Sequence, residues 1–102
     1  MILDSLRSKL VEYQKSKAEI EVSTIRLLIS ELKNKEIDLK GQGKEVTPED
    51  ELRIFKKQVK NRNETIPMYE KAGRLETAEK EKKELEFIQL LIKEYFPNEI
   101  SN

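Results

Sequence analysis

The sequence predicts an all-α protein, a compact bundle of about four helices forming one domain over residues 1–102. Hydrophobic residues make up 36% of the chain and charged residues 39%, a balance that suits helices that each bury one apolar stripe. Leu, Glu, Lys and Ile dominate, and most of these residue types lose little rotamer freedom in a helix. No segment shows the sustained period-two alternation, rich in β-branched residues, that predicts a strand.

Two helices are predicted in the first half of the chain. The first covers about residues 4–15 and carries one narrow apolar stripe. The second covers residues 16–40. Ser16 and Glu19 fit a capping box at its start, and Gly41 and Gly43 can end it through the left-handed conformation. The stripe of the first helix consists of Leu3, Leu6, Leu10 and Tyr13, and the wider apolar face of the second of Ile25, Leu27, Leu28, Ile29 and Leu32.

Two further helices are predicted in the second half. The third has the clearest start, with Thr47 as N-cap and Pro48 at the first helical position. Pro67 removes a backbone donor, which predicts that this helix is kinked or ends near Pro67. The fourth is predicted over residues 75–95 and stops at Pro97. The buried face of the third helix is expected to contain Leu52, Phe55, Val59 and Ile66.

The residue types present argue against a catalytic centre. The chain has no cysteine and no histidine, so it lacks thiolate ligands, the commonest general base and the commonest transition-metal ligand. The acidic residues 49–51 are consecutive at the start of a helix, which indicates compensation of the helix dipole and not a metal site. Ser23, Thr24 and Ser30 fall in mid-helix with no base to activate them. We therefore expect no enzymatic activity, no metal and no cofactor.

The expected location is the cytoplasm. The first residues contain Asp4 and no apolar core of signal-peptide length. No window approaches the ~18 apolar residues that a membrane span requires, so no membrane contact is expected. Lysine plus arginine equals aspartate plus glutamate at 20 each, so the net charge indicates no class of partner.

Local charge is more informative, because residues 53–62 carry five positive charges and no acid. On a helix, such side chains form a stripe opposite the apolar face and can follow a phosphate backbone. The alternative interpretation is a solvated face that aids solubility. The predicted stripe consists of Arg53, Lys56, Lys57, Lys60 and Arg62.

The second half of the last helix is apolar on every side, which predicts either burial from several directions or a partner-binding surface. The occupant would be a tail segment, a second copy of the chain or another subunit. The predicted partner-binding residues are Phe87, Leu90, Leu91, Tyr95 and Phe96.

Several sequence runs together resemble the YqeY family, in the order and near the spacing of that family. They are Ser23-Thr24-Ile25-Arg26-Leu27-Leu28, Leu32-Lys33-Asn34-Lys35-Glu36-Ile37, the Lys-x-x-x-Asn-Arg-x-Glu of residues 57–64, Tyr69-Glu70-Lys71-Ala72-Gly73-Arg74, Ala78-Glu79-Lys80-Glu81 and Glu94-Tyr95-Phe96-Pro97. The resemblance extends over almost the whole chain. It does not depend on any single short motif.

The resemblance implies an accessory role connected with tRNA. The YqeY family is similar to the C-terminal helical region of the B subunit of the aspartyl/glutamyl-tRNA amidotransferase, which helps to hold tRNA. A carbon–nitrogen ligase activity with glutamine as amido donor is implied by family inheritance only. Members of the family usually continue into a small tail domain, which we expect to be absent here because the sequence stops at Asn102.

The lead hypothesis is a non-catalytic accessory domain that binds the tRNA backbone through the stripe. Phosphate contacts position a protein on nucleic acid without specifying sequence, so binding by this domain is expected to be weak and nonspecific. The supplementary contacts are expected to be Arg26, Lys33 and Arg74. The alternative is a protein-interaction module that uses the apolar end of the last helix, self-association included.

Overall fold

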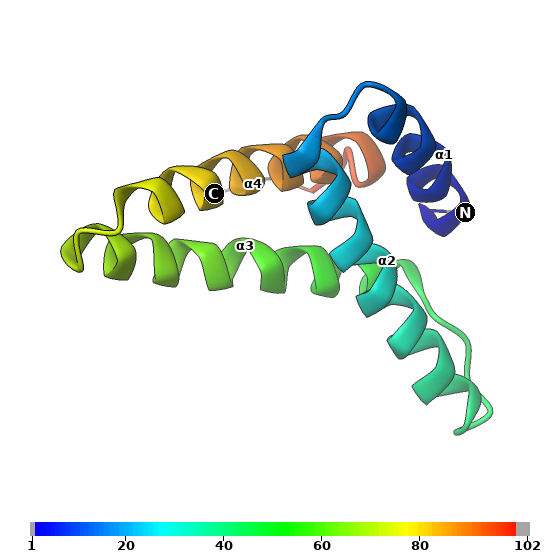
Figure 1. Ribbon diagram of the computed structural model, residues 1–102. Coiled ribbons are helices and arrows are strands. Elements are labelled where there is room, and N and C mark those ends of the chain that lie inside the picture. Colours follow the sequence, from blue (N-terminus) through cyan, green and yellow to red (C-terminus); the bar gives the residue numbers. More distant parts are fainter. Residues whose placement is uncertain (1, 100–102) are drawn as a thin grey trace. The chain divides into compact units, whose positions relative to one another are not determined.

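The computed structural model describes residues 2–99, which form four helices: α1 (Ile2–Lys15), α2 (Glu19–Lys40), α3 (Pro48–Lys71) and α4 (Leu75–Tyr95) (Figure 1). No strand occurs within this range, so the predicted all-α class with four helices is confirmed. By their internal contacts the residues form two units, one ending at Ile54 and the other beginning at Phe55. No helix within residues 2–99 is both long enough and apolar enough to cross a bilayer.

In the first unit, α1 packs against α2. Leu6 of α1 is completely buried, as are Ile25 and Leu28 of α2, and all three were predicted on apolar faces. Leu27 is only partly buried, whereas Thr24 is almost completely buried next to Ile25. The buried face of α2 is therefore narrower and more polar than the sequence indicated.

The turn between α1 and α2 differs from the prediction. Lys17 adopts the left-handed conformation with φ of 59°, and the Ala18 N–H donates to the Tyr13 carbonyl at 3.0 Å. This arrangement closes α1 in the manner of a Schellman motif. The Ser16 hydroxyl donates to the same Tyr13 carbonyl at 3.2 Å, and α2 begins only at Glu19. The predicted capping box at Ser16 is wrong, because Ser16 belongs to the end of α1.

The end of α2 depends on glycine, as the sequence predicts. Gly43 has φ of 72°, and the next residue, Lys44, donates its N–H to the Leu39 carbonyl at 2.8 Å. Gly41, by contrast, keeps a right-handed helical conformation at the C-cap. Of the two glycines, Gly43 is thus the one whose left-handed backbone closes the helix.

The start of α3 is a reciprocal cap built by Thr47 and Asp50. The Asp50 N–H donates to Thr47 Oγ1 at 3.2 Å, and the Thr47 N–H donates to Asp50 Oδ2 at 3.0 Å. The predicted N-cap Thr47 is confirmed, and Asp50 takes the place of the usual glutamate of a capping box. The Thr47 N–H, followed by the Thr47 hydroxyl, lowers the pKa of Asp50, because both donate to its ionised carboxylate.

The helix α3 continues through Pro67 and ends at Lys71, so it does not end near Ile66. A proline costs a helix one hydrogen bond to the carbonyl four residues earlier, here that of Asn63. Pro67 and Asn63 are both exposed, so water can satisfy the freed carbonyl. Gly73, two positions after Lys71, the last residue of α3, then closes the helix with its left-handed φ of 75°.

In the second unit, α4 runs back alongside the part of α3 that begins at Phe55 (Figure 1). Phe55 and Ile66 of α3 are buried, as predicted, whereas Val59 is only partly buried. Gln58 lies buried on the same face as the apolar residues. The buried residues of α4 are Ala78, Phe87, Ile88, Leu91 and Ile92.

Candidate nucleic-acid interface

Four of the predicted basic residues are exposed along α3: Arg53, Lys56, Lys57 and Lys60. Phe55 and Gln58, which lie between them in sequence, are buried, so the helix turns its basic side chains to solvent. Arg53 belongs to the first unit and the three lysines belong to the second. We call Lys56, Lys57 and Lys60 the lysine stripe.

The members of this face differ in their acidic neighbours. Arg53 Nη1 lies 3.5 Å from Asp50 Oδ1, three residues earlier on the helix. Lys56 pairs with Glu99, which follows α4. Within residues 2–99, Lys57 and Lys60 are exposed and have no ion-pair partner, so their ammonium groups are the most available of this set to an added anion.

Arg62 must be removed from the predicted stripe. Only 8% of the residue is exposed, and its guanidinium points into the second unit. Its Nε lies 3.3 Å from Glu84 Oε1 on α4, and its Nη1 donates to Gln58 Oε1 at 2.8 Å and to the Gln58 carbonyl at 3.2 Å. Arg62 therefore joins α3 to α4 and is not available for phosphate.

Further polar contacts join α3 to α4 along the same side. The Thr65 hydroxyl donates to a Glu81 carboxylate oxygen, and Lys82 Nζ lies 3.0 Å from Glu70 Oε2. The hydrogen bond from Lys82 to Glu70 raises the pKa of Lys82, because it favours the charged ammonium. No local pattern in the sequence predicted these contacts between the helices.

The supplementary residues lie in different parts of the molecule. Arg26 and Lys33 are exposed on one side of α2, in the first unit. Arg74 precedes α4 in the second unit, and its guanidinium carbon lies 5.2 Å from the centre of the Tyr69 ring, a cation–π distance. All three are exposed, and only Arg74 belongs to the same unit as the lysine stripe.

Most of the predicted partner-binding residues of α4 are buried or partly buried within the second unit. Phe87 and Leu91 are 8% and 3% exposed, so these two residues must be removed from the predicted docking surface. Tyr95 and Phe96 are partly buried, and both rings meet the ring of Phe55 edge to face, with centroids 6.2 Å and 5.6 Å away. Leu90, at 62% exposed, is the member of the predicted set that faces solvent.

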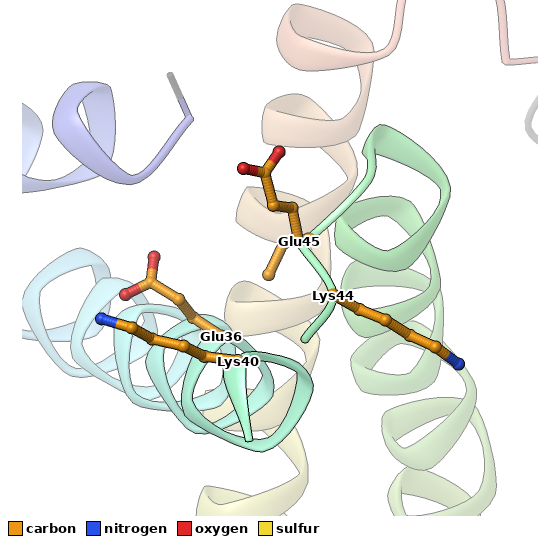
Figure 2. A pocket seen from close by; sticks show the side chains of 5 residues that line it. Glu36, Lys40, Lys44 and Glu45 are labelled. Atoms are coloured by element: carbon orange, nitrogen blue, oxygen red, sulfur yellow. The ribbon is translucent and has the colours of Figure 1, made fainter. Parts of the chain in front are cut away.

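A shallow depression in the first unit lies where α2 meets the following loop, and it is lined by Glu36, Lys40, Lys44, Glu45 and Val46. Figure 2 shows the Glu36 and Lys40 side chains extending side by side from α2, while Lys44 points away from them. The two acids and two lysines are exposed and balance in charge. Within the described chain, no three side chains of the metal-ligating types gather into a cation site.

Comparison with known proteins shows which family and which relative the chain resembles. The family model described as "Yqey-like protein" matches residues 3–102. The chain is also 32% identical over 93 residues to a fission-yeast protein named "Uncharacterized protein C22F3.15" (Schizosaccharomyces pombe), and the match covers 91% of this chain and 73% of that protein.

Proposed function

Because the chain belongs to the YqeY family, we propose that it is a non-catalytic accessory domain that binds the phosphate backbone of tRNA through exposed cations of α3. One observation carries the proposal: Lys57 and Lys60 lie one turn apart, exposed and without an ion-pair partner among residues 2–99. Two free ammonium groups at this spacing can each contact a phosphate of one strand and release its condensed counterions.

The charges on the face limit the strength of binding. Arg53 and Lys56 each have an acidic neighbour, and Arg62 is internal. Two to four phosphate contacts therefore remain, which corresponds to a slope of log K against log salt of roughly −1.5 to −3.5. Contacts of this kind do not read bases, so different tRNAs should bind with similar affinity.

The test is an anisotropy titration of labelled tRNA with the whole chain at 50 and 200 mM salt. The double substitution Lys57→Gln with Lys60→Gln should weaken binding and make the salt slope shallower by about 1.5, because two phosphate contacts are lost. The matched control is Lys80→Gln with Lys83→Gln, which removes two exposed lysines of α4. If both double variants weaken binding equally, the α3 face is not the site; if the unsubstituted chain binds no tRNA at 50 mM salt, the proposal fails.

The non-catalytic part of the proposal has its own test. The purified chain should not amidate aspartyl- or glutamyl-tRNA when ATP and glutamine are supplied. Product formation by the chain alone would contradict this part while leaving RNA binding open to the titration above.

A further inference from the structure

The segment that follows α4 holds an acid against one cation of the proposed RNA-binding face. We propose that Glu99 is a built-in competitor of RNA phosphate for Lys56, so that residues 96–99 act as an autoinhibitory strap on the lysine stripe. This inference rests on the proposed function, because the strap regulates the same face of α3. All of its residues belong to the second unit.

Hydrogen bonds and ring packing hold the strap in place. The Phe96 N–H donates to the Ile92 carbonyl at 2.8 Å, and the Glu99 N–H donates to the Phe96 carbonyl at 2.9 Å, which forms a turn directly after α4. The Phe96 ring meets Phe55 at an interplanar angle of 72°. Phe55 is completely buried and directly precedes Lys56, so the anchor of the strap and its acidic contact are adjacent on α3.

The contact between Glu99 and Lys56 has the chemistry of the contact that RNA would make. A carboxylate and a phosphate each offer anionic oxygens to the same ammonium group. The Lys56 side chain is 55% exposed and that of Glu99 is 28% exposed, so solvent and salt screen the pair. Exposed ion pairs are weak, so the strap should lower the affinity for RNA only modestly and should leave binding at Lys57 and Lys60 intact.

Two substitutions open the strap by different means. Glu99→Gln removes the competing charge, and Phe96→Ala removes the anchor without changing the charge. Each should add about one phosphate contact, which makes the salt slope steeper by about 0.7–0.9. The gain in affinity over the unsubstituted chain should then be about threefold larger at 50 mM salt than at 200 mM salt.

Two controls separate the strap from a general change in charge. Glu86→Gln removes one exposed acid of α4 and should leave the slope unchanged. Lys56→Gln should have little effect on the unsubstituted chain, where Glu99 occupies Lys56, but should cancel the gain produced by Glu99→Gln. Thermal melts by circular dichroism establish that each variant is folded under the titration conditions.

The possible results separate the inference from the function on which it rests. If tRNA binds and depends on Lys57 and Lys60, but Glu99→Gln behaves like Glu86→Gln, the strap is wrong and the function stands. If Phe96→Ala unfolds the chain, the comparison of Glu99→Gln with and without Lys56 still decides. If no variant binds tRNA, Glu99→Gln included, both the proposed function and the proposed strap are wrong.

Discussion

Arg62 differs in its role from the other basic residues of the run 53–62. It follows Lys60 by two positions, and on a helix that step turns the side chain about 200°, from the solvent face to the buried side. There it meets Glu84 and Gln58, so that its charge is paired and its donors are used. A buried guanidinium is tolerated only with such partners.

We expect Arg62→Ala to lower the free energy of unfolding by about 3 kcal/mol, because it leaves the Glu84 carboxylate, only 14% exposed, without its partner. Urea denaturation measures this difference. Lys60→Ala, two residues away and exposed, should change stability by no more than about 0.5 kcal/mol. A double-mutant cycle with Glu84→Gln should show coupling, and additive effects would mean that the two side chains do not interact in solution.

Thr24 presents the opposite case, a buried polar group with no partner. It is 1% exposed, and within the described chain its hydroxyl oxygen has no hydrogen-bond partner. Thr24→Val keeps the shape and removes the unsatisfied hydroxyl, so the free energy of unfolding should rise by about 1 kcal/mol. Ser23→Ala, at an exposed hydroxyl that donates to the Ile20 carbonyl, provides the control. A loss of stability in Thr24→Val would show that the hydroxyl has a partner.

Among the helices, α3 has the start whose stability should depend most directly on pH. The bonds from Thr47 lower the pKa of Asp50 in the folded state, so its ionisation stabilises the fold above the unfolded pKa of about 3.9. This contribution is lost as the pH falls through the lowered folded value. The unsubstituted chain should therefore be more stable than Asp50→Asn at pH 7, with the difference shrinking below about pH 4.

Thermal melts of both proteins from pH 7 to pH 2.5 measure this difference. Glu49→Gln is the matched control, because it neutralises an acid in the same helical turn that has no bond to Thr47. Its effect at pH 7 should be smaller than that of Asp50→Asn. A difference between Asp50→Asn and the unsubstituted chain that stays constant down to pH 2.5 would mean that the carboxylate is not bonded to Thr47.

Helix boundaries could be predicted where a local signal was unambiguous. Thr47 followed by Pro48, and glycine after α2, mark boundaries through residues close in sequence. The end of α1 was missed because a lysine, Lys17, takes the left-handed position that glycine usually takes. The sequence left open whether α3 is kinked or ends near Pro67, because the cost of a proline depends on whether water reaches the freed carbonyl, and that access depends on the tertiary structure.

Contacts between helices could not be predicted, because nothing local specifies them. The sequence places Lys56 on an exposed helical face, but its pairing with Glu99 depends on how the chain turns after α4. The burial of Phe87 and Leu91 likewise follows from packing and not from the apolar run alone. The sequence therefore predicts the exposed cations of α3 well and their acidic partners poorly.

At the scale of the whole molecule, the charge state should be nearly constant around neutral pH. The chain has no histidine and no cysteine, so among ordinary side chains none titrates in the middle of this range. Burial raises the pKa of the Glu51 carboxyl. Measurements at constant charge should therefore begin at a pH well above the usual carboxylate range. The hydrogen bond to Glu70 raises the pKa of Lys82 and keeps that side chain charged toward higher pH.

We therefore expect the affinity for tRNA, measured at fixed salt, to change by less than about twofold between pH 6.5 and 8.5, because the chain has no histidine or cysteine and the RNA phosphates stay ionised. Stability should be similarly flat over this window. Anisotropy titrations and urea denaturation at three pH values provide the measurements. A strong dependence between pH 6.5 and 8.5 would mean that binding is not governed by the cations of α3.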